Sequence, residues 1–98
     1  MEKTKKASER IEFILMADEL DVLKISDKLL IGTPIMINFD GYDEIEANKV
    51  ITFLSGVTYA IDGEIEVVQR KVFLFASKQD YKDGSLRKFV KQHKELWV

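Results

Sequence analysis

The segment Gly32-Thr33-Pro34 constrains the fold of this chain more than any other, because it separates a helical pattern from a strand pattern. Gly32 follows the amphipathic stretch ELDVLKISDKLL and suits the left-handed residue that ends a helix. Pro34 cannot continue a helix but is tolerated as the first residue of a strand, here PIMINF at 34–39. The apolar run IEFILM at 11–16 predicts an earlier strand, buried largely on both faces. This order predicts parallel strands joined by a crossover helix.

Capping and turn signals define the rest of the fold. Asp18 is expected to cap the first helix, with Asp21 near its positive end. Asp43 and Glu46 have the spacing of a capping box, which begins a second helix that ends near Gly63. EIEVV and KVFLFAS flank QRK as an antiparallel hairpin, which makes the order βαβαββ. A basic helix ends the chain and gathers these residues on one side: Leu86, Phe89, Val90, His93, Leu96 and Trp97.

Composition and charge narrow the class of protein. A chain of 98 residues with 46% hydrophobic side chains fits one small domain. The absence of cysteine excludes disulfides and thiolate metal sites. The polar start MEKTKKASER lacks the features of a signal peptide, and no apolar run is long enough to span a bilayer, so we expect a cytoplasmic protein. Residues 11–66 carry 12 acidic and 3 basic side chains, whereas 67–98 carry 3 acidic and 8 basic ones, so the tail is either a solvated face or a contact for an acidic partner.

The second helix carries small residues on a side that is not its predicted core side. At about 100° per residue, one face holds Val50, Phe53, Leu54, Val57 and Ile61. Thr52, Gly56 and Ala60 recur every four residues elsewhere on the helix, and such a groove lets another helix approach closely. The pattern therefore predicts a flat second surface for a contact with another helix or backbone. The alternative is that Gly56 packs inside its own domain or permits a bend.

Motifs for catalysis, metal binding or phosphate binding are not found. His93 is the sole histidine, and no nucleophile and base can be paired with it. Asp40, Asp43, Glu44 and Glu46 lack the ligand spacing of a calcium loop, and helix capping explains two of them. We therefore predict no enzyme activity, no metal and no cofactor.

Four segments together resemble the core domain of the SepF family, cell-division proteins that bind the tubulin-like polymer FtsZ. They are Ile37-Asn38-Phe39, ANKVITFLSG at 47–56, YAIDG at 59–63 and Val72-Phe73-Leu74. The resemblance covers about residues 11–77. It divides the chain into a polar segment at 1–10, a core domain at 11–77 and a basic amphipathic helix at 78–98.

The resemblance implies an α/β (α+β) sandwich, with two helices on one face of a small mixed sheet and a C-terminal helix on the other. It implies a homodimeric, non-catalytic adaptor that acts in the cytoplasm at the division site, near the membrane, and helps to organise the division ring. Carried over by motif, the positions for the C-terminal peptide of FtsZ are Ala47, Lys49, Phe53 and Phe73, and Gly56 is assigned to self-association. From the residues alone, Phe53 and Phe73 are also candidates for the core, and Lys49 for a solvated side chain.

The chain departs from the family pattern at three places. Only about ten polar residues precede the first strand, where SepF proteins carry a membrane-binding helix and a linker. Thr52 replaces the family's aspartate, and Ala76-Ser77 replaces its Thr-Pro.

Other functions stay open at this point. The order βαβαββ also occurs in Alba-like nucleic-acid-binding domains, for which Arg87, Lys88, Lys91 and Lys94 are the available cations. Trp97 beside these lysines is alternatively a contact for an anionic membrane surface. A third alternative is a SepF-like scaffold for another partner.

Overall fold

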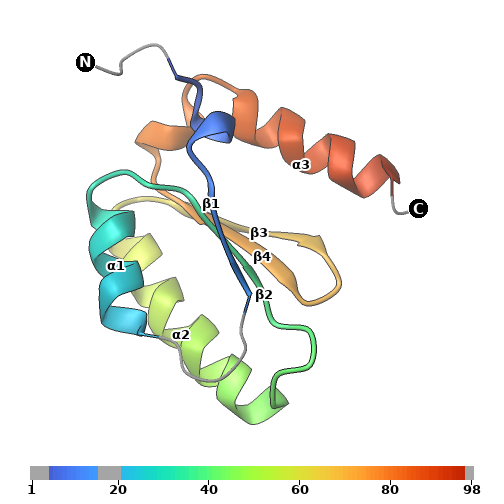
Figure 1. The fold of residues 1–98 in the computed structure, drawn as a ribbon. Helices are drawn as coiled ribbons and strands as arrows, with labels where there is room; N and C mark the ends of the chain where they lie inside the picture. Colours follow the sequence, from blue (N-terminus) through green and yellow to red (C-terminus); the bar gives the residue numbers. More distant parts are fainter. Residues whose placement is uncertain (1–4, 16–20, 97–98) are drawn as a thin grey trace.

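A four-stranded mixed sheet lies between two layers of helices (Figure 1). The computed structural model describes residues 5–15 and 21–96. The sheet has the order β1-β2-β4-β3, with β1 parallel to β2 and the other neighbours antiparallel. The predicted α+β fold is confirmed. Its elements are η1 (Ala7–Glu9), β1 (Glu12–Leu15), α1 (Val22–Leu30), β2 (Ile35–Asn38), α2 (Glu44–Ala60), β3 (Glu64–Gln69), β4 (Val72–Ala76), η2 (Gln79–Tyr81) and α3 (Ser85–Leu96).

Helix α1 begins later than predicted and ends where predicted. Its N-cap is Asp21, whose carboxylate accepts the backbone N–H groups of Leu23 and Lys24 at 3.1 Å. Asp21 therefore has the capping role that was assigned to Asp18, which lies outside the described residues. At the other end, Gly32 has a φ of +94° and its N–H donates to the carbonyl oxygen of Leu29. This left-handed residue closes the helix before the chain enters β2.

The hairpin of β3 and β4 turns at Arg70 and Lys71. Lys71 has a φ of +66°, so the turn uses a left-handed residue although it lacks the usual Asn-Gly pair. The register shifts between Val67 and Gln69, which makes Val68 the extra residue of a bulge. Val68 is buried and belongs to the core on the α3 side of the sheet.

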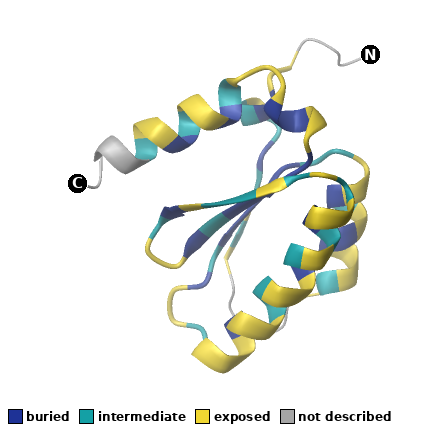
Figure 2. Ribbon diagram, turned by 180° about the vertical axis from the view of Figure 1, so that it is seen from behind, coloured by how far each residue is buried: buried dark blue, intermediate teal, exposed yellow. Residues whose placement is uncertain are grey.

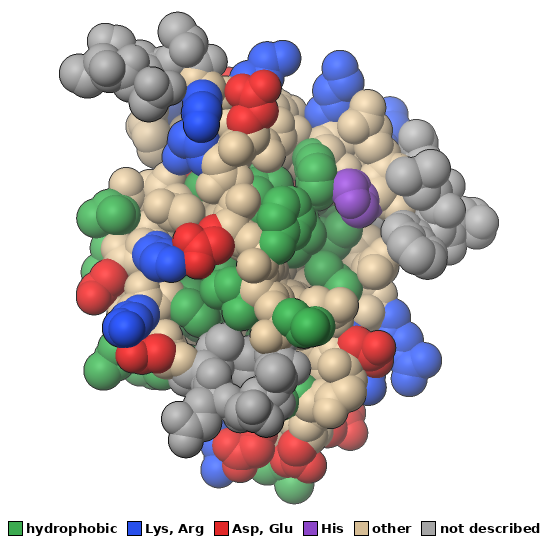
Figure 3. Space-filling view, viewed as in Figure 1, with side chains coloured by type: hydrophobic (Ala, Val, Ile, Leu, Met, Phe, Trp, Pro, Cys, Tyr) green, Lys and Arg blue, Asp and Glu red, His purple; other side chains and the backbone are tan. Residues whose placement is uncertain are grey.

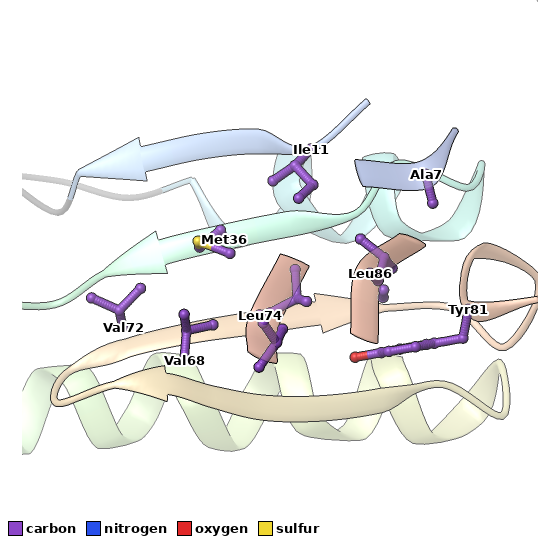
Figure 4. Packing of buried hydrophobic residues seen from close by; sticks show 10 residues of the cluster. Ala7, Ile11, Met36, Val68, Val72, Leu74, Tyr81 and Leu86 are labelled. Atoms are coloured by element: carbon purple, nitrogen blue, oxygen red, sulfur yellow. The ribbon is translucent and has the colours of Figure 1, made fainter. Parts of the chain in front are cut away.

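Alternation along the central strands supplies two cores. Ile35, Ile37 and Phe75 point to α1 and α2, where they pack with Leu29 and Leu54. The other face of the same strands carries Met36 and Leu74, which pack beneath η1, η2 and α3 (Figure 4). The residues labelled there are Ala7, Ile11, Met36, Val68, Val72, Leu74, Tyr81 and Leu86.

Strand β1 is an edge strand, and the prediction that it is buried on both faces is wrong. Phe13 is 63% exposed and Leu15 is 68% exposed, both on the α3 side of the sheet. Ile14 packs against the core on the α1 side. The hairpin end of the sheet on the α3 side is therefore only partly covered by the described residues.

Hydrogen bonds join the two ends of the described chain. The N–H of Ala7 donates to Asp83 and the N–H of Ser8 donates to the hydroxyl of Ser85, both at 2.9 Å. Arg10 forms an ion pair of 2.7 Å with the buried carboxylate of Asp80, and it also donates to the carbonyl oxygen of Gly32. The N-terminal turn is thus fixed to the layer that contains α3 (Figure 1).

Candidate protein-binding site on helix α2

The start of α2 is fixed by the predicted cap. Asp43 is the N-cap, and its carboxylate accepts the N–H of Glu46 at 3.1 Å. Glu44 and Glu46 lie in the first turn, where carboxylates interact favourably with the positive end of the helix. The cap thus sets the first turn of the helix half that carries Ala47, Lys49 and Phe53.

The buried side of α2 differs from the predicted one by a partial rotation. Ala47, Leu54 and Thr58 are buried, whereas Phe53 is 43% exposed. Thr58 is buried although it is polar, because its hydroxyl donates to the carbonyl oxygen of Leu54 at 2.7 Å. The prediction that Phe53 belongs to the core face is therefore wrong, while Val50, Val57 and Ile61 pack against the core as expected.

A small depression on one flank of α2 contains Ala47 and Phe73. Its volume is about 170 Å³. Phe73 is half-buried, and its ring meets the ring of Phe39 edge-on at 5.7 Å between centroids. The depression is lined by Phe39, Tyr42, Glu44, Ala47, Asn48, Ile51, Lys71 and Phe73.

A second, shallower depression lies on the outer face of α2 and contains Lys49 and Phe53. Its other lining residues are Ile45, Asn48 and Thr52. The ammonium group of Lys49 is 3.3 Å from the carboxylate of Glu46, one turn earlier, and both side chains are exposed. An exposed ion pair of this kind contributes little to stability, so Lys49 remains available to an acidic partner.

Asn48 lines both depressions and connects them across the helix. The structure therefore distributes the four predicted residues over two adjoining surfaces, with Ala47 and Phe73 in one and Lys49 and Phe53 in the other. The sequence interpretation did not include Tyr42, Ile45, Asn48 and Ile51. Ile45 could have been proposed from the sequence, because it is an apolar residue shortly after the predicted cap. In the structure it is exposed.

Thr52, Gly56 and Ala60 are all exposed on α2. Figure 2 shows that exposed residues follow the outer side of this helix. A Cβ atom added to Gly56 would meet no described atom within 4 Å. Packing inside the domain, as far as the structure describes it, therefore does not require glycine at this position. Gly56 also lies within a helix that continues from Glu44 to Ala60, so the glycine does not interrupt it.

The single histidine has structural contacts within α3. The ring of His93 stacks on that of Phe89 at 4.1 Å, and Nδ1 is 3.2 Å from the carbonyl oxygen of Phe89. Within residues 5–15 and 21–96, no three His, Asp or Glu side chains gather as metal ligands would. None of the helices in the described part of the chain has both the length and the apolar character needed to cross a bilayer.

Comparison with known proteins identifies the family. The family model of the cell division protein SepF matches residues 13–79, which include α1, α2, β2 to β4 and all of β1 except its first residue. The chain belongs to the SepF family. This assignment agrees with the resemblance seen in the sequence and makes the chain a member of a family of cell division proteins.

Individual SepF proteins show the same relationship. The SepF protein of Carboxydothermus hydrogenoformans is 32% identical over 69 residues, which are 70% of this chain and 50% of that protein. The SepF protein of Limosilactobacillus reuteri is 35% identical over 71 residues, which are 72% of this chain and 51% of that protein. The chain therefore spans about half the length of the curated SepF relatives that it matches.

Proposed function

We propose that this chain is a non-catalytic cell-division adaptor that binds the C-terminal peptide of FtsZ along α2 and associates with a second copy of itself. The cytoplasmic side of the division site is the location that this role requires. The observation that carries the proposal is the pair of adjoining depressions on α2, which combine partly exposed aromatic side chains with the lysines Lys49 and Lys71. Membership of the SepF family supports the same role.

The chemistry of the two depressions suits a short peptide. Phe53 and Phe73 offer partly exposed aromatic surface for apolar side chains, while Lys49 and Lys71 lie beside them as cations. Aromatic anchors with a charged rim are the usual arrangement at peptide-binding surfaces. The first turn of α2 is acidic, since it carries Asp43, Glu44 and Glu46, and it would repel the carboxylates of a peptide. An acidic peptide is therefore expected to place its carboxylates near the lysines.

The test is a titration with a fluorescent peptide of the host FtsZ C-terminus at near-physiological salt, with a scrambled peptide alongside. Phe53→Ala is expected to weaken binding about tenfold or more, as truncation of an anchor does. Lys49→Glu is expected to weaken it several-fold and to reduce its salt dependence. Tyr59→Ala is the matched control, because Tyr59 is also an exposed aromatic residue of α2 but lines neither depression.

Unchanged affinity in folded Phe53→Ala and Lys49→Glu variants would show that the peptide binds elsewhere. If neither the true nor the scrambled peptide binds, the chain serves another partner, and DNA, RNA and anionic vesicles are the next ligands to test. Loss of binding in the Tyr59→Ala control would indicate a general effect on α2 rather than a site at its N-terminal half.

Self-association is proposed for the stripe of Thr52, Gly56 and Ala60. The exposure of all three residues and the open space around Gly56 support it, because small residues allow a facing helix to come close. Leu23 and Leu30 on α1 are further exposed apolar residues in the same helix layer. Their burial in a dimer would add to the stability of a small domain.

A further inference from the structure

The face of the sheet opposite α1 and α2 holds an apolar groove that the proposed function does not use. It has a volume of about 520 Å³ and runs from β1 across β2 and β4 to β3. Figure 3 shows hydrophobic side chains gathered beside the histidine. The apolar lining residues are Phe13, Ile14, Leu15, Met36, Val68 and Val72, and the polar ones are Asn38, Gln69 and His93.

A polar depression adjoins the groove at the hairpin turn. It shares Asn38, Gln69 and Val72 with the groove and adds Asp40, Arg70 and Lys71. Neither Arg70 nor Lys71 has an ion-pair partner among the residues that the structure describes. The apolar groove therefore leads to two cations and one carboxylate.

Gln69 lies where the two depressions meet and has an unused acceptor. Its Oε1 is buried and has no hydrogen-bond partner within the described part of the chain. A buried acceptor without a donor costs free energy, and it gains a partner if a bound molecule supplies one. The terminal torsion of a glutamine side chain has a broad preference, so the carboxamide can turn toward the groove at little cost.

We propose that this groove binds a single-chain anionic amphiphile. The apolar chain lies along Leu15, Met36 and Val68, an amide or hydroxyl group donates to Gln69 Oε1, and the anionic group lies beside Arg70 and Lys71. The volume of the groove falls within the range of about 300–1,000 Å³ that is typical of small-molecule sites.

The lining of the groove favours an alkyl chain over a peptide. A peptide would bring backbone N–H and C=O groups that need partners in an apolar place, whereas an alkyl chain brings none. Of the polar side chains that line the groove, Asn38 already accepts the N–H of Asp40 at 2.8 Å. The Nδ1 atom of His93 is occupied by the carbonyl oxygen of Phe89. Gln69 Oε1 is a buried acceptor without a donor among the described residues, which matches a molecule with one donor between its chain and its charge.

The test uses three probes as monomers below their critical micelle concentrations. N-dodecanoylglycine has the chain, the N–H donor and the carboxylate. N-dodecanoylsarcosine differs by a methyl group on the nitrogen, so it lacks the donor, and dodecyltrimethylammonium has the opposite charge. Isothermal titration is expected to show one site that prefers N-dodecanoylglycine over the sarcosine by about three- to tenfold, the value of one hydrogen bond. Amide chemical shifts are expected to change at Met36, Val68 and Val72.

Variants assign each part of the molecule to its residues. Leu15→Glu places a carboxylate in the groove wall and is expected to weaken binding of N-dodecanoylglycine at least tenfold, while Ile31→Glu, at an exposed isoleucine directly after α1, leaves it unchanged. Gln69→Leu is expected to abolish the preference for the glycine over the sarcosine probe. Arg70→Gln combined with Lys71→Asn is expected to abolish the preference for the anionic over the cationic probe.

Several results would overturn the proposal. One is that the cationic probe binds the unmodified chain as tightly as N-dodecanoylglycine does. Another is that binding begins only when micelles form or on phosphatidylglycerol vesicles. A third is that the changes in chemical shift are confined to α2. A monomer produced by Leu15→Glu but not by Ile31→Glu would assign the groove to a second copy of the chain instead. The FtsZ peptide should bind the Leu15→Glu variant normally, so failure of this inference can be told apart from failure of the proposed function.

Discussion

Gly63 lies against the backbone of Ala76, so that a Cβ atom on Gly63 would overlap the carbonyl oxygen of Ala76. This contact forms where the chain leaves α2 and joins β3 to β4. The opposing atom belongs to the backbone of a buried strand end and cannot move aside as a flexible side chain would. We therefore expect Gly63→Ala to lower the free energy of unfolding by about 2 kcal/mol or more, measured by urea denaturation.

The matched control for that substitution is Gly56→Ala. Gly56 has open space around its Cα and lies inside a helix, where alanine is more favourable than glycine by about 0.5–1 kcal/mol. The isolated domain should therefore become more stable by up to that amount. A loss of stability comparable to that of Gly63→Ala would mean that Gly56 has a packing partner within the domain.

Gly56→Lys tests self-association separately from folding. The added side chain points into open space in a single copy, and lysine is more favourable than glycine inside a helix, so the melting temperature of the diluted protein should not fall. In a dimer that uses the small-residue stripe, the lysine would hold the facing helix away. Light scattering should then show a smaller particle than for the unmodified chain, and an unchanged particle size would assign any dimer to a different surface.

The ion pair of Arg10 and Asp80 should make a large contribution to stability. Asp80 is buried and its other side-chain partner is the hydroxyl of Ser77. Arg10→Ala removes the compensating charge from a buried carboxylate, which is expected to cost about 3 kcal/mol in chemical denaturation. Lys49→Ala is the control for an exposed pair and should cost less than about 0.5 kcal/mol.

Tyr81 should make the domain sensitive to alkaline pH. Burial raises the pKa of Tyr81 above its ordinary value, and the charge of Glu66 and the hydrogen bond to it raise it further. The folded state therefore keeps a proton that the unfolded chain loses above about pH 10. The stabilisation is complete below that pH, and it falls by up to about 1.4 kcal/mol per pH unit above it. Denaturation between pH 9 and pH 12 should show this slope, and Tyr81→Phe should reduce it.

The element order could be predicted from the sequence because the residues that begin and end its helices act locally. Gly32 and Asp43 act through their own backbone and their near neighbours, so the residue type is sufficient to indicate a helix end or start. The exposure of Phe13 and Leu15 could not be predicted in this way. Every position of the IEFILM run except Glu12 is apolar, so the sequence has no alternation to show that one face of an edge strand is open.

The candidate site was only partly predictable for a similar reason. The positions on α2 were identified, but which of them face the sheet depends on how the helix lies against β4. Burying the hydroxyl of Thr58 would cost free energy, but its hydrogen bond to the carbonyl oxygen of Leu54 offsets that cost. A hydropathy pattern does not take such a hydrogen bond into account. Phe53 is consequently displaced toward solvent, and the two depressions lie on either side of Asn48.

The hydrogen bonds from Ala7, Ser8 and Arg10 to the start of the α3 layer have a mechanical consequence. Because the N-terminal turn is fixed on that side of the sheet, η1 and α2 lie on opposite sides of it (Figure 1). The sheet therefore separates η1 from α2. A partner bound to α2 would be separated from an attachment at η1 by the thickness of the three layers. A force applied between the two would act perpendicular to the faces of the sheet.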